Sequence, residues 1–281
     1  MAAARRRRGR RSRRGDLSPR DLAIGGAIGV VALVLLVVAA RFTVFAPKPP
    51  DRDPETGCPE AGPAALTAIL IDVTDQIGPV SRADVLAHLD EYVADSREDE
   101  MVLAYEAKPV GDEIGAPLLS VCHPGDPDEA SEWTENPRLI RRRLEQRFER
   151  PLEQLFAELL GRDAAPTSPL MESVQSVAVS VLGRHEYADL PKRLILVSDL
   201  MQNTRNLSFF RQAVDYDAFA ATTGAGALGT DLRGTAVEVL FVQRTAHQRL
   251  DGTRGLIGFW QQWIEDQGGT LNRVVRVDGV N

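Results

Sequence analysis

Two apolar stretches of this sequence each run directly into carboxylates and hydroxyls, which are groups that can bind a hard cation. The first is Ala68-Ile69-Leu70-Ile71, followed by Asp72-Val73-Thr74, and the second is Leu194-Ile195-Leu196-Val197, followed by Ser198-Asp199. Such an apolar run is typical of a buried parallel strand, and the polar residues after it mark a site at the carboxyl end of the strand. We therefore expect Asp72, Thr74 and Asp199 to converge.

A third polar segment, Thr167-Ser168, precedes a predicted helix and could join the same site. In open α/β sheets, sites form beyond the carboxyl ends of the strands. The side chains expected there offer oxygen atoms and include no His or Cys. Such donors suit Mg²⁺ or Mn²⁺, which keep some of their waters or take an oxygen from a partner. The pattern therefore predicts Mg²⁺ or Mn²⁺ as the cofactor.

With these segments in this order, the sequence resembles a von Willebrand factor A-like (vWA) domain over roughly residues 64–277. The family carries Asp-x-Ser-x-Ser after its first strand, a Thr in a second loop and an Asp after its fourth strand. Asp72-Val73-Thr74 matches the first two positions, Ser168 falls on the Thr position, and Asp199 falls on the last Asp. The resemblance implies a metal-ion-dependent adhesion site (MIDAS) made of Asp72, Thr74, Ser168 and Asp199.

The sequence departs from the family pattern at the third hydroxyl position. Gln76 stands there, with Asp75 inserted before it. Gln can supply an oxygen but its side chain is longer, so the resemblance also allows a degenerate metal site. The residues that could add ligands are Gln76, Thr167 and Asp75.

The same residues admit interpretations other than a metal-binding module. Asp72 and Asp199 could accept backbone N–H bonds at turns, and Ser168 could cap a helix. A Mg-dependent phosphate-ester hydrolase could use Asp72 as its nucleophile, but Thr74 occupies the position where such an enzyme needs a second carboxylate. The sequence contains neither Gly-x-Ser-x-Gly nor His-Glu-x-x-His. We therefore assign no catalytic residue and favour a binding module over an enzyme.

Strand-like and helix-like stretches alternate after residue 64, which predicts an α/β domain with a Rossmann-like, doubly wound, mostly parallel six-stranded sheet. The link between the second and third strands is too short for a helical crossover, so these two should form an antiparallel pair at one edge. The predicted strands are Thr67–Val73, Met101–Tyr105, Leu118–Cys122, Arg193–Ser198, Val237–Val242 and Leu271–Val277.

Helices are predicted between these strands. The first has Ser81 as its N-cap and ends near Ala94, and the longest is interrupted at Pro151 because proline lacks the backbone N–H. A glycine-rich stretch, Thr223–Gly229, is predicted to be a flexible loop. The remaining predicted helices are Pro137–Leu160, Leu170–Leu182, Ser208–Phe219 and Leu256–Gln267.

The amino-terminal part differs from the rest in charge and hydropathy. Residues 1–41 hold ten Arg and two Asp, so they carry +8 while the remainder carries −15. Residues 22–40 are uncharged and mostly apolar; as a helix they would be roughly 28 Å long, close to the ~30 Å hydrocarbon core of a bilayer. By the positive-inside rule, the amino terminus is predicted to be cytoplasmic and the carboxyl-terminal domain extracytoplasmic, in the periplasm or outside the cell.

These features predict four parts: a basic cytoplasmic tail (1–21), a transmembrane helix (22–40), a Pro-rich linker (41–63) and a vWA-like domain (64–281). The Arg-rich tail should contact anionic lipid. Such a run could also bind nucleic acid, but beside a spanning helix we expect no nucleic-acid partner. A cleaved signal peptide is the alternative to an anchor, although its apolar core is usually shorter and ends in a small-residue cleavage site.

The chain has two cysteines, Cys58 and Cys122, and both fall in the part predicted to be extracytoplasmic. An even pair in an oxidising compartment predicts one disulfide, and two buried thiols are the alternative. The whole pattern predicts a single-pass membrane protein whose vWA-like domain binds an unidentified protein partner or serves assembly. The alternatives are the hydrolase described above and a scaffold with a non-functional metal site.

Overall fold

The computed structural model describes residues 19–44, 51–72, 77–107, 115–130, 136–162, 168–243 and 252–277. Contacts divide the chain into two units, Met1–Pro49 and Pro50–Asn281. The first unit includes α1 (Pro19–Val44), in which Ala23–Arg41 is long and apolar enough to cross a membrane. The side chains of this stretch are exposed, which distinguishes it from the core helix of a globular domain.

The second unit is built on a six-stranded sheet with the strand order β3-β2-β1-β4-β5-β6. Every neighbouring pair is parallel except β2 and β3, which are antiparallel. The predicted fold class, a mostly parallel six-stranded sheet with one antiparallel edge strand, is confirmed. The strands are β1 (Ala65–Ile71), β2 (Glu100–Glu106), β3 (Leu119–Cys122), β4 (Lys192–Ser198), β5 (Thr235–Val242) and β6 (Thr270–Val277).

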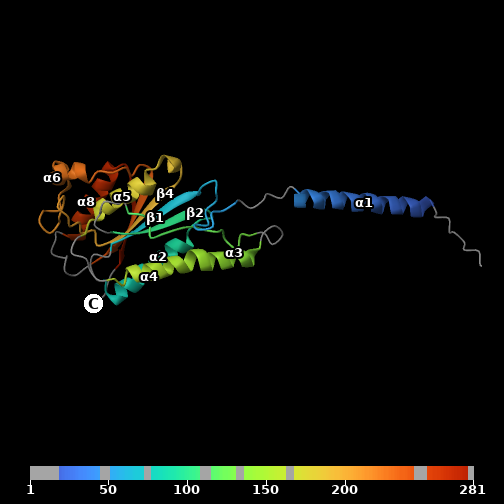
Figure 1. Cartoon of the computed structure of the whole chain (residues 1–281), viewed down its shortest axis with the longest axis horizontal. Coiled ribbons are helices and arrows are strands. Elements are labelled where there is room, and N and C mark those ends of the chain that lie inside the picture. Colours follow the sequence, from blue (N-terminus) through green and yellow to red (C-terminus); the bar gives the residue numbers. More distant parts are fainter. Residues whose placement is uncertain are drawn as a thin grey trace, which may run out of the picture. The chain divides into compact units, whose positions relative to one another are not determined.

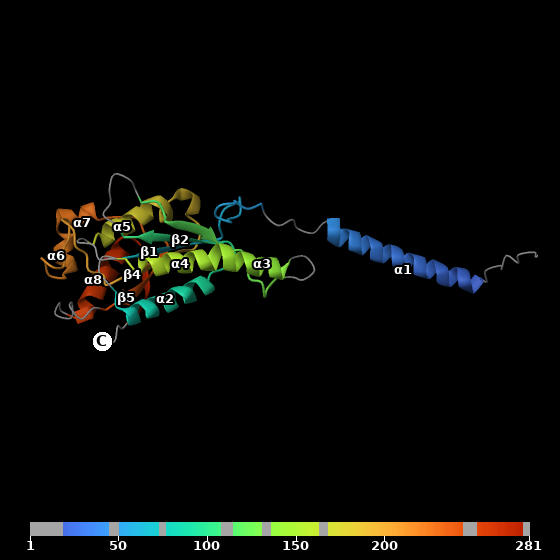
Figure 2. The same ribbon diagram turned by 60° about the horizontal axis from the view of Figure 1, so that its bottom comes forward.

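Helices cover both faces of this sheet (Figure 1 and Figure 2). One face is covered by α2 (Pro79–Ala94), by the π-helical segment η1 (Leu144–Glu149) and by α4 (Arg150–Leu159). The helix α3 (Pro137–Arg143), which has no buried residue, continues directly into η1. The other face is covered by α5 (Leu170–Val177), the π-helical segment η2 (Ala178–Leu182) and α8 (Gly252–Asp266). Three short helices complete the described part: η3 (His185–Tyr187), α6 (Tyr216–Ala220) and α7 (Thr223–Ala227).

The two faces of β1 belong to two separate hydrophobic cores. Successive side chains of a strand point to opposite faces. Leu70 therefore packs in the core that contains Trp260, while Ile71 packs in the core that contains Phe148. A strand buried on both faces needs apolar side chains at nearly every position, which is why the sequence of β1 is a continuous apolar run.

The predicted interruption at Pro151 takes the form of a change in helix type. The six residues of η1 directly before α4 adopt π-helical geometry, and Pro151 stands in the first turn of α4. Because proline has no N–H to donate, one turn of the hydrogen-bond ladder must be rearranged, and a π-helical turn is a common way to do so.

The structure corrects three details of the predicted helices. α2 begins at Pro79 with Gly78 as its N-cap, so Ser81 lies inside the helix; Pro at the first helical position has the φ that a helix requires. Most of residues 208–219 is irregular, and α6 begins only at Tyr216 because Asp215 caps it by accepting from Ala218 N–H at 3.0 Å.

The third correction concerns the glycine-rich stretch, which forms the short helix α7 rather than a flexible loop. A side chain at Gly224 would come within 2.6 Å of the Asn206 carbonyl oxygen, so glycine allows a close backbone approach there. Gln175 Nε2 donates to the carbonyls of Ala227 and Gly229 at 3.3 Å and 2.8 Å, which ties the end of α7 to α5. Tertiary contacts therefore override the low helix propensity of glycine.

The predicted disulfide between Cys58 and Cys122 is confirmed. It joins the segment that enters the second unit to the edge strand β3, where Cys122 N–H also donates to the Thr56 carbonyl at 2.9 Å. The two cysteines are 64 residues apart in the sequence, so the bond closes a long loop. Closing a loop of this length limits the entropy of the unfolded chain.

Replacing both cysteines by serine should therefore lower the free energy of unfolding by about 4 kcal/mol. The measurement is denaturant unfolding of the full chain in detergent, for wild type with and without reductant and for the Cys58→Ser, Cys122→Ser variant. The reductant should destabilise wild type and leave the variant unchanged. Equal midpoints for wild type in both conditions would show that the disulfide does not contribute.

Candidate functional site

Asp72 and Ser198 lie side by side because β1 and β4 are parallel neighbours in register. Ile71 is paired with Val197, so the next residue of each strand is brought together, and Asp72 N–H donates to the Val197 carbonyl at 2.8 Å. Ser198 Oγ donates to Asp72 Oδ2 at 2.9 Å and accepts from Leu200 N–H at 2.8 Å. Asp72 and Ser198 are both buried, with exposed fractions of 2% and 1%.

Ser168 reaches the same carboxylate from a different part of the chain. It lies just before α5 and is held there by its carbonyl, which accepts from Asn203 N–H at 2.8 Å. Its Oγ donates to Asp72 Oδ2 at 3.1 Å. Hydroxyls from two segments far apart in sequence therefore converge on one oxygen of one buried carboxylate.

Asp199 follows β4 directly and is also buried. Its Oδ1 accepts from Met201 N–H at 3.0 Å. Burial, and after it the negative charge of Asp72, raises the pKa of Asp199 to about 7, although backbone hydrogen bonds act in the opposite direction. Two carboxylates that interact inside the protein make the fully ionised site unfavourable near neutral pH. A proton or a cation at this site would relieve that cost.

The loop after β4 is fixed by buried hydrogen bonds. Leu200 has a positive φ of 61°, and its carbonyl accepts from Trp260 Nε1 at 2.9 Å. Gln202 is fully buried; its Oε1 accepts from Met171 N–H at 2.9 Å, and its Nε2 donates to Glu172 Oε2 at 2.7 Å. Because Gln202 ties this loop to the start of α5, it keeps the segment that carries Ser168 next to the end of β4.

The structure thus brings together three of the predicted ligands, Asp72, Ser168 and Asp199. The remaining candidates, Thr74, Asp75, Gln76 and Thr167, lie outside the described residues. Ser198 was not predicted as a site residue. The signal for it is the register: the residue that follows Val197 must stand beside the residue that follows Ile71 once β1 and β4 are paired.

The described donors limit what kind of cation could bind. Within the described part of the chain, no group of three or more His, Cys, Asp or Glu side chains is arranged to hold a metal ion. A cation would therefore depend on the carboxylates of Asp72 and Asp199 together with hydroxyl oxygens such as that of Ser168. Oxygen donors with two negative charges fit Mg²⁺ or Mn²⁺, which complete their shells with water or with an oxygen from another molecule.

No protein-family model and no curated protein matches the chain. Among solved structures it is similar to the conserved hypothetical protein BatB from Bacteroides thetaiotaomicron, with 14% identity over 77% of this chain and 92% of that chain and a TM-score of 0.36. It is also similar to an aerotolerance-related membrane protein from Bacteroides fragilis, carrying multiple mutations to serines, with 12% identity over 76% and 92% and a TM-score of 0.31.

The raised pKa of Asp199 gives the domain a specific pH dependence. A carboxyl whose pKa is higher in the folded state stabilises the fold below its unfolded pKa, near 3.8, and this contribution is lost as the pH rises through about 7. Asp199→Asn should abolish that loss, which is on the order of 4 kcal/mol for a shift of about three units. The measurement is the free energy of unfolding in chelator between about pH 4 and 8.

The matched control is Asp189→Asn, which removes an exposed carboxylate elsewhere in the second unit. Its pH profile should run parallel to that of wild type, whereas the Asp199→Asn profile should be flatter. Parallel profiles for all three proteins would contradict the assignment of a raised pKa to Asp199.

Proposed function

We propose that residues 50–281 form a vWA-like binding module that is anchored in a membrane by α1 and recognises a protein partner through a divalent cation. The observation that carries this proposal is the convergence of Ser168 and Ser198 hydroxyls on Asp72 Oδ2, beside the second buried carboxylate of Asp199. The hydroxyls come from segments about thirty residues apart, and the register of the sheet aligns one of them. Two carboxylates with hydroxyl oxygens are donors of the kind that hard cations bind.

In the proposed site, Asp72 and Asp199 supply the negative charge, and Ser168 supplies a neutral oxygen. A bound Mg²⁺ or Mn²⁺ would offset the repulsion between the two carboxylates and would bind a carboxylate oxygen of the partner. Ser198 is a further donor within reach of Asp72. Thr74 and Gln76 belong to the proposal as sequence neighbours of Asp72, with Asp75 and Thr167 as additional candidates.

The membrane part of the proposal follows from α1 and its flanking charges. The helix is long and apolar enough to cross a bilayer, and the Arg-rich tail before it should lie on the cytoplasmic side against anionic lipid. The second unit would then be extracytoplasmic. The disulfide between Cys58 and Cys122 supports an oxidising compartment for that unit.

A protease added to intact cells, or to spheroplasts where the cells have an outer membrane, should therefore digest the second unit and leave α1 with the cells. The full chain is followed by antibodies against each end, and a cytoplasmic protein serves as the control for membrane integrity. Digestion that requires permeabilisation of the membrane carrying α1 would contradict the proposed orientation. In that case the disulfide would no longer support an oxidising compartment for the second unit.

The metal is tested by thermal unfolding of the full chain in detergent, near pH 8, with Mg²⁺ or Mn²⁺ and with chelator. Metal at about 100 times its Kd adds about 2.7 kcal/mol to the free energy of unfolding, which for a domain of this size raises the Tm by roughly 5–10 °C. Asp72→Asn and Ser168→Ala should reduce the rise, because each removes an oxygen that the proposal assigns to the cation.

The matched control is Ser173→Ala, which removes from α5 a buried hydroxyl that makes no hydrogen bond to Asp72 or to any other described residue. Ser173→Ala should keep the full response to metal. If wild type and Asp72→Asn respond identically, the domain is a scaffold without a working metal site, and the proposal fails.

A second candidate function is hydrolysis of phosphate esters with Asp72 as the nucleophile. The observation that favours it is the pKa of about 7 at Asp199, because a carboxyl with such a pKa can exchange protons near neutral pH. The test is turnover of para-nitrophenyl phosphate with Mg²⁺. Turnover that Asp72→Asn abolishes would replace the binding module by an enzyme, and we expect none.

A further inference from the structure

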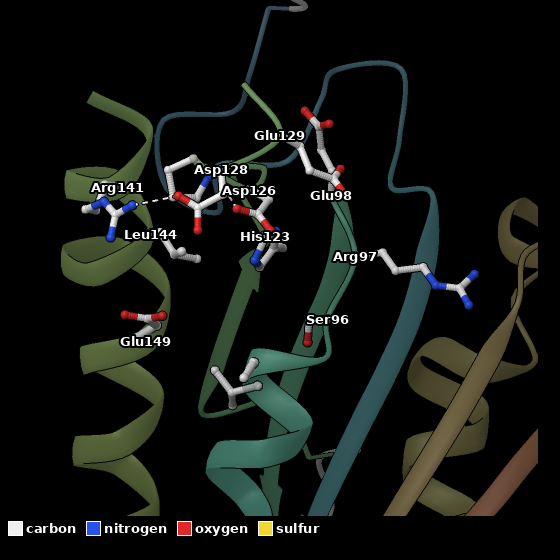
Figure 3. Close-up of a pocket in the computed structure, with 13 residues that line it drawn as sticks. Ser96, Arg97, Glu98, His123, Asp126, Asp128, Glu129, Arg141, Leu144 and Glu149 are labelled. Atoms are coloured by element: carbon white, nitrogen blue, oxygen red, sulfur yellow. Dashed lines mark hydrogen bonds and ion pairs between the residues drawn. The ribbon is translucent and has the colours of Figure 1, made fainter. Parts of the chain in front are cut away.

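A pocket of about 410 Å³ lies at the end of the sheet opposite to Asp72. Figure 3 shows the side chains that line it. It is formed where α2 ends, where β2 begins and where β3 runs into the loop that leads to α3, and its far wall is the π-helical segment η1. Its volume falls within the range of about 300–1,000 Å³ that is usual for ligand pockets. The residues of the candidate metal site do not line it.

Negative charge dominates this pocket. Five carboxylates and two guanidinium groups line it. One guanidinium is engaged, since Arg141 donates to Asp128 Oδ1 at 2.9 Å, and the other, on Arg97, extends away from the acidic groups (Figure 3). Burial and the nearby charges of Glu153 and Glu145 raise the pKa of Glu149, which has no cationic partner among the described residues.

His123 is a second and independent sign of a ligand. It lines the pocket and is only 6% exposed, and burial lowers its pKa, so its ring is neutral near pH 7. Its Nδ1 accepts from Gly125 N–H at 3.3 Å, which places the proton of the neutral ring on Nε2. That N–H makes no hydrogen bond within the described part of the chain. Such a donor is satisfied either by water in the pocket or by an acceptor of a bound ligand.

The walls of the pocket are held in place by the fold. Cys122, next to His123, is tied to Cys58 by the disulfide. The Phe148 ring of η1 packs against the His123 ring with their centroids 4.9 Å apart. Gly125 has a φ of +103°, which L side chains rarely adopt, and its N–H donates to His123 Nδ1. These contacts restrict the positions of the His123 Nε2–H donor and of the carboxylates that line the pocket.

We propose that this pocket binds a basic segment of a partner protein, with an arginine side chain between the carboxylates and a main-chain carbonyl on His123 Nε2–H. Guanidinium groups bind carboxylates through paired hydrogen bonds, so Glu149 and Asp126 suit such a side chain. The peptide carbonyl supplies the acceptor that the imidazole requires. The metal site is not involved, so this binding should be the same with Mg²⁺ and with chelator.

The probe is the peptide acetyl-Gly-Arg-Gly-Arg-Gly-amide, titrated calorimetrically into the full chain in detergent at about 50 mM salt, where charge pairs are less screened. Its counterpart with citrulline in place of arginine has nearly the same shape without the charge. The arginine peptide should bind saturably, and the citrulline peptide should bind at least about tenfold more weakly. Equal affinity of the two peptides, or no saturable binding up to about 5 mM, would overturn the proposal.

The variant Asp126→Asn, Glu149→Gln should weaken the arginine peptide about tenfold, because two charge pairs are lost. The matched control is Asp189→Asn, Glu265→Gln, which removes the same charge from exposed positions outside the pocket. An equal loss in both variants would mean attraction to the acidic domain as a whole and would overturn the pocket assignment. His123→Leu should also weaken binding of the arginine peptide several-fold. The Tm of this variant is measured in parallel to check that it is folded. Unchanged affinity would show that His123 is not part of the site.

Discussion

The parallel pairing of β1 with β4 is the constraint on which the candidate site depends. It sets Ile71 opposite Val197, and the next residue of each strand then meets the other as a hydrogen-bonded pair, Asp72 with Ser198. The same pairing places Asp199 close enough to Asp72 for their negative charges to interact. A shift of the register by one residue would turn Asp72 toward the other face of the sheet and separate these groups. The geometry of the site is therefore a property of the sheet rather than of its loops.

Ionisation of Asp199 costs free energy of folding, because Asp199 is buried and lies close to the charge of Asp72. The rest of the structure offsets this cost without removing it: apolar cores cover both faces of the sheet, and Gln202 fixes the loop after β4 against the start of α5. Without a ligand, burial disfavours the negative charges of Asp72 and Asp199. A cation that binds between them removes this cost, so the same burial favours cation binding. This coupling is the physical basis for proposing a cation at Asp72 and Asp199.

The sequence was sufficient to predict the sheet, because strands buried on both faces have continuous apolar runs and the short link before β3 excludes a crossover. It also predicted that Asp72, Ser168 and Asp199 meet. Ser198 could not be predicted from its own neighbourhood, since its role depends on the register with β1. The helix α7 was missed because contacts from α5 outweigh the propensity of its glycines, and the pocket around His123 depends on packing between segments distant in sequence.

The central claim, that a divalent cation binds between Asp72 and Asp199, is tested most directly by counting bound Mn²⁺ through its electron paramagnetic resonance signal. The full chain is titrated in detergent near neutral pH, beside the Asp72→Asn and Ser173→Ala variants. The account predicts one saturable Mn²⁺ site per chain in wild type and Ser173→Ala, displaced by Mg²⁺ and absent from Asp72→Asn. Free Mn²⁺ signals that are the same for wild type and Asp72→Asn would contradict it.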